Sequence, residues 1–285
     1  MAPEEVWLIT GASRGIGAEL VKQVLAKDNT KVVAGARSPK TSPLLHNLQD
    51  RYQDRLHTLA LDVSSNASIL AAAESVTNLL PFKDIDYLVN NAAIANAEQT
   101  RAEKPDTLTE MLQTNVIGVH AMTQAFLPLL QSGQKKTVIN ISSAMGSMNV
   151  WYHQFTVRND QPIPMTKSSL GYKVSKAALN MRKRPYFFPP AACAEVSGWA
   201  TDAVTLSWAS DVTPEEGFTF VAIEPGTVDT DASTAMMQKW GMDKTALESR
   251  LSPAQAVGTM LETIAKLTPE DSGRFLKSDG NVFLY

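Results

Sequence analysis

The chain alternates short apolar runs with longer segments whose apolar residues recur at helical spacing. The runs are nearly continuous in hydrophobicity, which is typical of parallel strands buried on both faces. They lie at residues 6–10, 31–36, 56–63, 86–92, 136–142, 218–225 and 273–277, with helical segments at 15–27, 67–80, 108–130 and 252–267. This alternation predicts a single α/β domain with a doubly wound parallel sheet, covered on both faces through right-handed crossovers.

The start of the last helical segment is marked by three residues. Ser252 is placed as the N-cap, Pro253 occupies the first helical position, and Gln255 lies where it closes a capping box. We therefore expect a helix that begins at Pro253.

The amino-acid composition narrows the possible classes of protein. The chain has 285 residues and a net charge of -3, so there is no electrostatic case for binding nucleic acid or an anionic membrane. It lacks a long apolar stretch and a basic leader, and Cys193 is the single cysteine. We expect a cytoplasmic protein with no membrane span and no internal disulfide. The four histidines lack metal-ligand spacing, so no metal site is predicted (His46, His57, His120 and His153).

The first predicted strand runs directly into a glycine-rich turn, "TGASRGIGAEL", with glycines at positions 11, 15 and 17. Glycines between a strand and a helix let the backbone approach a pyrophosphate, and the helix N-terminus supplies amides and a positive dipole end. A tight turn without a ligand is the alternative interpretation. The strand-to-helix context favours nucleotide binding.

Several motifs in this order resemble the short-chain dehydrogenase/reductase family. They are "TGASRGIG" at 10–17, "LDV" at 61–63, "NNAA" at 90–93, Asn115, "NISS" at 140–143, "YKVSK" at 172–176 and "PGTVDT" at 225–230. The resemblance extends over nearly the whole chain and is closest to the carbonyl-reductase-like branch. It implies a Rossmann fold and a nicotinamide cofactor.

Two arginines indicate which nicotinamide cofactor is used. An acidic residue at the end of the second strand would bind the ribose hydroxyls of NAD, but that position holds Ala36, followed by Arg37. Arg14 lies within the glycine turn. Two guanidinium groups and no carboxylate favour a 2′-phosphate, so NADP(H) is predicted over NAD(H). Ordinary solvated arginines are the alternative.

The resemblance also assigns the cofactor-binding residues. Asp62 and Val63 are expected to flank the adenine, and Asn90 to lie near the ribose. Ala93 replaces the glycine that ends the family motif, a mild departure. The full predicted set is Gly11, Ser13, Arg14, Gly15, Ile16, Gly17, Arg37, Asp62, Val63, Asn90, Ala92, Tyr172, Lys176, Pro225, Gly226, Val228 and Thr230.

Tyr172 and Lys176 are one helical turn apart and share a face. A ketone reduced by hydride becomes an alkoxide that needs a proton, which a tyrosine can donate. An unperturbed tyrosine has a pKa of about 10. The nearby lysine is expected to lower that pKa towards neutrality, where acid–base catalysis works best. Taken alone, the pair could be an exposed helix pair, but the upstream motifs favour catalysis.

Two more residues complete the predicted catalytic set. Ser143 follows the fifth strand, where its hydroxyl can hydrogen-bond a developing oxyanion. The resemblance implies that Lys176 also holds the nicotinamide ribose, and that Asn115 holds a water that relays protons to it. The sequence therefore predicts an NADPH-dependent carbonyl reductase. The alternative is an impaired or non-catalytic NADP(H)-binding protein, and aldehyde, quinone and ketone substrates all remain open.

Residues 226–251 are predicted to form a substrate lid. This segment contains flexible and aromatic apolar residues, namely Met236, Met237, Trp240 and Met242. Such residues suggest an apolar substrate. Plain packing against a neighbouring helix is an equally good interpretation.

Residues 182–203 interrupt the catalytic helix. This stretch has proline breaks and no amphipathic period, and from Tyr172 to Pro225 the chain is 53 positions long. The family interval is about 30, the extent of one helix, a loop and a strand. We predict helix at 172–181, an irregular insertion over 182–203, and helix or turn near 204–211.

The origin of this insertion has two explanations. Removing Arg182–Ala203, 22 residues, restores helical character, and the genetic code permits splice signals at both ends. A translated intron is therefore our hypothesis, and a real surface insertion is the alternative. The family usually dimerises through this helix and the one containing Asn115, so a real insertion would block or remodel a homodimer interface.

Overall fold

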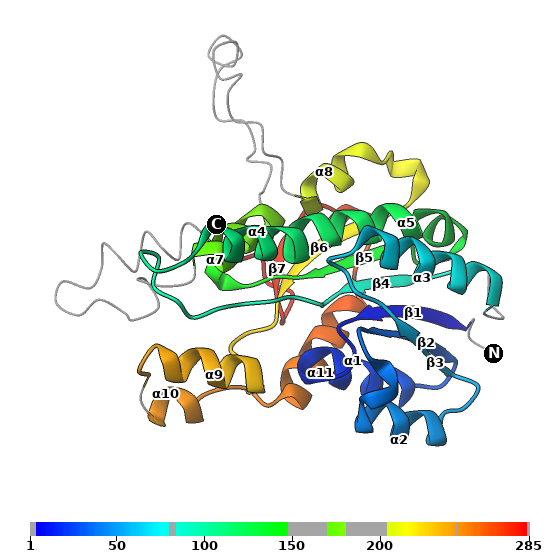
Figure 1. Cartoon of the computed structure of the whole chain (residues 1–285). Coiled ribbons are helices and arrows are strands. Elements are labelled where there is room, and N and C mark those ends of the chain that lie inside the picture. The colour runs from blue at the N-terminus through cyan, green and yellow to red at the C-terminus, as the bar shows by residue number, and fades with distance from the viewer. Residues whose placement is uncertain (1–3, 80–83, 148–169, 181–203, 243, 284–285) are drawn as a thin grey trace, which may run out of the picture.

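The computed structural model describes residues 4–79, 84–147, 170–180, 204–242 and 244–283. Within these ranges, seven parallel strands form one sheet in the order β3-β2-β1-β4-β5-β6-β7 (Figure 1). The strands are β1 Glu5–Thr10, β2 Thr30–Ala36, β3 Leu56–Ala60, β4 Tyr87–Asn90, β5 Thr137–Ile141, β6 Thr219–Glu224 and β7 Phe275–Lys277. The predicted doubly wound parallel sheet is confirmed.

Helices cover both faces of the sheet (Figure 1). One layer contains α1, α2 and α11, and the other contains α3, α5 and α8. The helices are α1 Gly15–Leu25, α2 Pro43–Arg51, α3 Asn66–Leu79, α4 Pro105–Leu112, α5 Gly118–Ser132, α7 Leu170–Asn180, α8 Val204–Asp211, α9 Asp231–Lys239, α10 Lys244–Glu248 and α11 Pro253–Ile264. A π-helical segment, Gln113–Ile117, joins α4 to α5.

Strand β1 shows why the apolar runs are continuous. Val6 and Leu8 pack into the core beneath α3 and α5, whereas Trp7 and Ile9 pack into the core beneath α1 and α11. Alternate residues of a strand point to opposite faces, so a strand covered on both sides needs apolar residues at every position. Each such buried side chain contributes about 1.5–3 kcal/mol.

The predicted start of the last helix is confirmed. Ser252 caps α11 and forms a capping box with Gln255, and Pro253 is the first helical residue. No helix in the described part of the chain combines the length and apolar composition that crossing a bilayer requires.

The interrupted helix agrees with the prediction on both sides of the anomalous stretch. Helix α7 ends at Asn180, and α8 begins at Val204. The predicted irregular insertion, 182–203, lies outside the described residues.

Candidate active site

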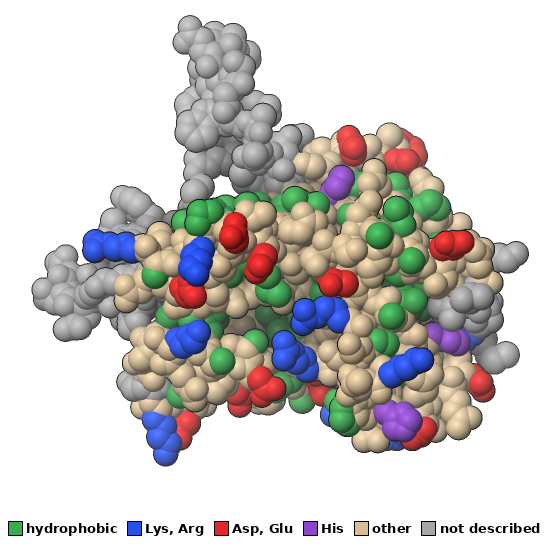
Figure 2. All heavy atoms as spheres, viewed as in Figure 1, with side chains coloured by type: hydrophobic (Ala, Val, Ile, Leu, Met, Phe, Trp, Pro, Cys, Tyr) green, Lys and Arg blue, Asp and Glu red, His purple; other side chains and the backbone are tan. Residues whose placement is uncertain are grey.

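Strand order reverses between β1 and β4, which is where doubly wound sheets bind ligands at the carboxyl ends of their strands. The glycine turn follows β1, and residues 91–94 follow β4. Figure 2 shows this face hollowed between the layer that carries α4 and the α9–α10 segment.

Glycine is required in the turn because other chain segments approach closely. Gly11 has φ 65°, and a Cβ there would lie 2.8 Å from the Cα of Ala92. A Cβ on Gly17 would lie 2.3 Å from the carbonyl oxygen of Gly11. Gly17 is buried beneath the turn, so it allows α1 to pack against the turn.

A cavity of about 260 Å³ lies over this turn. Ten of the predicted cofactor residues line it: Gly11, Ser13, Arg14, Gly15, Ile16, Arg37, Asp62, Val63, Ala92 and Thr230. Gly17, Asn90 and Lys176 line neither this cavity nor the neighbouring one described below. Both cavities are lined by Ile16, Thr230 and Ala232, so they adjoin.

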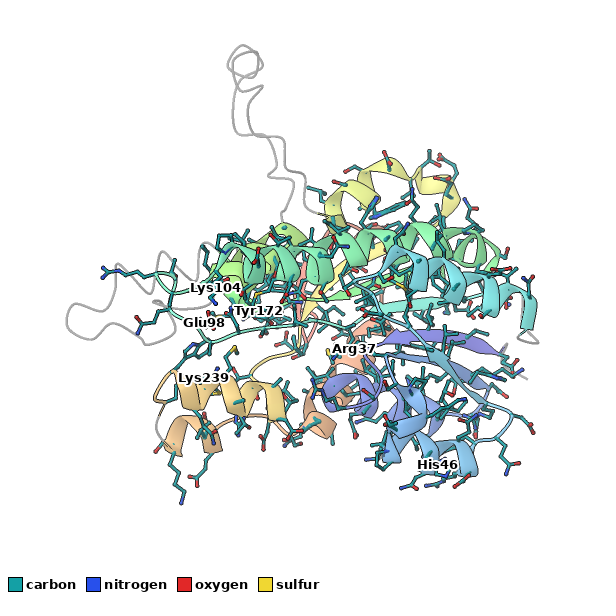
Figure 3. All side chains as sticks on the ribbon, viewed as in Figure 1. Arg37, His46, Glu98, Lys104, Tyr172 and Lys239 are labelled. Atoms are coloured by element: carbon teal, nitrogen blue, oxygen red, sulfur yellow. The ribbon has the colours of Figure 1, made fainter. Side chains whose placement is uncertain are left out.

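Arg14 and Arg37 are both exposed and both line the first cavity. No salt bridge engages either guanidinium among the described residues. Asp62 accepts hydrogen bonds from the backbone and hydroxyl of Ser64 at 2.9 and 2.7 Å. These bonds, with a smaller contribution from Arg37, hold the pKa of Asp62 below its ordinary value. The Arg37 side chain is labelled in Figure 3.

Asn90 ends β4, and its side chain points into the sheet core and not into either cavity. Its carboxamide is buried and donates to Asn140 Oδ1 at 2.9 Å, inside the sheet core. Asn90 is two residues after Leu88, which packs under α5, so strand periodicity points both side chains into that layer. Asn91 lines the cavity instead, and its Nδ2 donates to the Thr10 carbonyl oxygen at 2.8 Å.

Ser143 and Tyr172 meet in the second cavity. Ser143 follows β5, and its hydroxyl accepts a hydrogen bond from the Met145 backbone at 3.1 Å. Tyr172 lies on α7 (Figure 3). Burial raises the pKa of Tyr172, while a hydrogen bond with Ser143 acts to lower it. The predicted shift of this pKa towards neutrality is therefore wrong for the protein without cofactor.

Lys176 does not offset the effect of burial on the pKa of Tyr172. Its Nζ is 5.7 Å from the centre of the Tyr172 ring and donates to the Ile141 carbonyl oxygen at 2.7 Å. The side chain is 3% exposed, and burial lowers its pKa to about 8. Desolvation therefore disfavours the charged form of both the buried lysine and the half-buried tyrosine.

Asn115 lies in the π-helical segment Gln113–Ile117 and is fully buried. Its side chain accepts from the Ile94 backbone at 2.9 Å and donates to the Ile94 carbonyl at 2.8 Å and to Ser175 Oγ at 3.0 Å. Asn115 thus joins the segment after β4 to the helix that carries Tyr172. Single π turns often mark functional positions.

Glu103 is a site residue that sequence reasoning missed. Its Oε1 accepts a hydrogen bond from the Gly171 backbone at 2.7 Å, at the first turn of α7. A carboxylate at a helix N-terminus accepts a hydrogen bond from an amide that has no partner within the helix. Its negative charge also interacts favourably with the positive end of the helix dipole. Glu103 therefore positions the start of the helix that carries Tyr172, and its distance of 68 positions from Gly171 left no local signal.

The second cavity has a volume of about 420 Å³. Ser143 and Tyr172 lie in its wall, together with the predicted cofactor residues Pro225, Gly226, Val228 and Thr230. The apolar residues noted in the sequence, Met236, Met237, Trp240 and Met242, line it as well. Their position on a cavity wall favours the substrate-contact interpretation over plain packing.

Arg250 links the loop after β6 to helix α9. Its guanidinium forms a 2.8 Å ion pair with Asp229 and donates to Thr234 Oγ1 at 2.7 Å. The arginine side chain is 7% exposed. It thus connects the loop after β6 to the first turn of α9, across the wall of the second cavity. No His, Cys, Asp or Glu cluster in the described ranges is placed to hold a metal ion.

Comparison with known proteins agrees with this geometry. A family model described as short chain dehydrogenase matches residues 5–154. An uncharacterised oxidoreductase of Schizosaccharomyces pombe is 32% identical over 281 residues, which cover 96% of this chain and 95% of that protein. The NADPH-bound carbonyl reductase from chicken fatty liver is 31% identical with a TM-score of 0.77, over 99% of this chain and 100% of that one. The carbonyl reductase Sniffer of Drosophila melanogaster shares the fold, with a TM-score of 0.74 at 23% identity over 99% and 100% of the two chains. This chain belongs to the short-chain dehydrogenase/reductase family.

Proposed function

We propose that this protein is an NADPH-dependent reductase of apolar carbonyl compounds. The observation that carries the proposal is the pair of adjoining cavities. One is lined by the glycine turn and two arginines, and the other holds Ser143 and Tyr172 within apolar walls.

The first cavity fits a dinucleotide that carries a 2′-phosphate. Its wall includes the first residues of α1, so backbone amides and the positive end of the helix dipole face it. The close approach of Gly11 to Ala92 leaves no room for a side chain beneath the turn. Arg14 and Arg37 supply guanidinium groups for the phosphate, and the NADPH-bound structure of the chicken relative supports the same cofactor.

The second cavity supplies the acid and the oxyanion donor. Bound NADPH would supply the hydride for the carbonyl carbon, and the carbonyl oxygen would then need a proton to become an alcohol. Tyr172 donates this proton from its hydroxyl. The hydroxyl of Ser143, which hydrogen-bonds Tyr172, stabilises the negative charge that develops on the same oxygen.

The hydroxyl of Tyr172 is protonated at neutral pH, which is the form that donates a proton to the alkoxide, because burial raises its pKa. Lys176 is buried beside the ring and tied to the Ile141 carbonyl. We assign Lys176 to holding the nicotinamide ribose and Asn115 to the proton relay.

The experiment is an NADPH-oxidation screen with aldehydes, quinones and aromatic ketones, run on the wild type and on Tyr172→Phe. We expect turnover with part of the panel, and a loss of at least 100-fold in Tyr172→Phe with NADPH binding retained, because general acid catalysis contributes about 10²–10⁴. A folded wild type that binds NADPH and oxidises it with no compound would instead support the non-catalytic alternative.

A further inference from the structure

The guanidinium of Arg250 is buried and joins three segments of the chain. Its Nε donates to the Leu247 carbonyl oxygen at 2.8 Å, near the end of α10. Its Nη1 donates to the hydroxyls of Ser233 and Thr234 at 3.1 and 2.7 Å, at the start of α9. Its Nη2 forms the ion pair with Asp229, in the loop after β6. The donors of a guanidinium lie in one rigid plane, so this one side chain fixes the three segments relative to one another.

The segment that contains α9 and α10 leaves the body of the protein and rejoins it at one place. The N–H of Leu251 donates to the Thr227 carbonyl at 2.9 Å, and the N–H of Asp229 donates to the Leu251 carbonyl at 2.8 Å. Figure 1 shows α9 and α10 standing apart from both helix layers. Neither helix packs extensively against another helix or strand in the described part of the chain. The position of α9 therefore depends on the contacts at the base of the segment, where Arg250 precedes Leu251.

Helix α9 forms part of the wall of the second cavity. Three of its residues line this cavity, Ser233, Met236 and Met237. Ser233 is bound directly by Arg250, and Met236 lies about one turn further along the same face of the helix. In Figure 3, Tyr172 lies on one side of the hollow, and α9, which ends at the labelled Lys239, lies on the other. Arg250 is thus connected to the methionine wall through the first turn of α9.

The size of a substrate decides how much it depends on this wall. A small carbonyl compound reaches Ser143 and Tyr172 without filling a cavity of about 420 Å³. A compound with a larger apolar body extends further, to the methionines, whose flexible thioethers suit aromatic surface. The affinity for the larger compound then depends on where α9 is held.

We propose that Arg250 is a positioning residue that holds the methionine wall of α9 in place and thereby determines how well carbonyl compounds with large apolar bodies bind. This inference rests on the proposed reductase function.

Two variants and one control test the proposal. Arg250→Lys keeps the positive charge but cannot reproduce the rigid fork of donors. Asp229→Ala removes one partner of Arg250 at a side chain that is 58% exposed, so folding is at little risk. The control is Lys244→Met, which breaks the exposed 3.5 Å ion pair between Lys244 and Glu248. That pair lies within α10 and does not connect the segment to the rest of the chain.

The substrates are benzaldehyde and 4-phenylbenzaldehyde, which carry the same reacting group and differ by one apolar ring. In Arg250→Lys, kcat/KM for 4-phenylbenzaldehyde should fall by about tenfold, the value of one charge-assisted hydrogen bond. The loss should lie mainly in KM, because binding is weakened and the proton donor is untouched. Benzaldehyde should be affected little. Asp229→Ala should act in the same direction, and Lys244→Met should change neither aldehyde.

A second measurement needs no turnover: calorimetric binding of each aldehyde to the NADP⁺-loaded wild type and variants. A loss of affinity confined to 4-phenylbenzaldehyde in Arg250→Lys and Asp229→Ala supports the inference. Equal losses for the two aldehydes, unchanged affinities in both variants, or the same selective loss in Lys244→Met would overturn it. Absence of NADPH oxidation with every aldehyde would count against the reductase function instead, and the binding comparison would still decide the role of Arg250.

Discussion

The hydroxyl of Thr205 donates a hydrogen bond to the carbonyl oxygen of Leu179 at 2.8 Å, although the two residues are 26 positions apart. Elsewhere in this protein, threonines inside helices make the same bond to the residue four positions earlier, as Thr77, Thr109 and Thr123 do. Removing 22 residues between Leu179 and Thr205 would give this spacing. We infer that α8 continues α7 as one helix and that residues 182–203 are the surplus.

Thr205 is also the last link of a buried polar chain. Its hydroxyl accepts from Asn140 Nδ2 at 2.9 Å, and Asn140 Oδ1 accepts from Asn90 Nδ2 at 2.9 Å. These side chains belong to α8, β5 and β4, and all three are buried. The register between α7 and α8 is therefore coupled to the centre of the sheet.

The first prediction concerns deletion of residues 182–203. The shortened chain should fold, retain NADPH binding and be more stable, by roughly 2–3 kcal/mol, because closing a loop of this length no longer costs entropy. Urea denaturation measures the gain.

Two matched deletions test the register. Removing 182–202 or 181–203 moves Thr205 to five or three positions after Leu179, and each residue turns a helix by about 100°. Both deletions should destabilise the protein relative to the 22-residue deletion. Equal stability for all three would contradict the continuous helix. A mature transcript that retains codons 182–203 would separately exclude a translated intron, whatever the deletions show.

The second prediction concerns Thr205→Val. This change leaves the amide of Asn140 without its buried acceptor, so the free energy of unfolding should fall by about 1–3 kcal/mol. Thr259→Val on α11 is the control, because Thr259 makes the same helical bond at the surface, to the Gln255 carbonyl. The control should lose less than about 0.5 kcal/mol. A Thr205→Val variant as stable as the control would mean that the buried hydrogen bonds of Thr205 do not contribute to the free energy of unfolding.

The third prediction concerns Arg37→Asp. The change removes a guanidinium from the cavity and adds a repulsive carboxylate, so the Kd for NADPH should rise by about 10- to 100-fold, and that for NADH much less. Lys40→Asp is the charge-matched control, because Lys40 is exposed and does not line the cavity. If Arg37→Asp weakened both cofactors equally, Arg37 would not be the residue that reads the 2′-phosphate.

The fold could be predicted because its signals are local. Apolar runs and glycine positions identified the sheet and the turn, and Ser252 with Gln255 marked the start of α11. The direction of the Asn90 side chain could not be predicted, because a motif indicates which residues are adjacent in the chain and not which face of the strand each side chain takes. The packing of Leu88 under α5 decides which alternate residues of β4 face that layer, and Asn90 is one of them.

Other parts of the site could not be predicted because their partners are distant in sequence. Arg250 reaches Asp229 and Thr234, and Glu103 reaches Gly171, and neither contact leaves a pattern along the chain. The pKa of Tyr172 was predicted in the wrong direction because burial depends on the packed structure, whereas the spacing of Tyr172 and Lys176 reports their proximity alone.

The last prediction concerns the pH dependence of stability and rests on Lys176. Burial lowers its pKa from 10.5 in the unfolded chain to about 8 in the folded protein. Between these pH values the unfolded chain holds a proton that the folded protein has released, so the free energy of unfolding should increase as the pH rises through this window. A shift of this size corresponds to about 3 kcal/mol at 1.36 kcal/mol per pH unit.

Lys173, whose pKa is also lowered to about 8, acts in the same direction. The raised pKa of Tyr172 acts in the opposite direction above about pH 10, so urea denaturation of the cofactor-free protein should be followed from pH 7.5 to 9.5. Lys176→Met should remove its share of the increase, and Lys173→Met should leave the Lys176 share in place. Stability curves for the wild type and Lys176→Met that run parallel across this range would show that the folded protein keeps Lys176 charged.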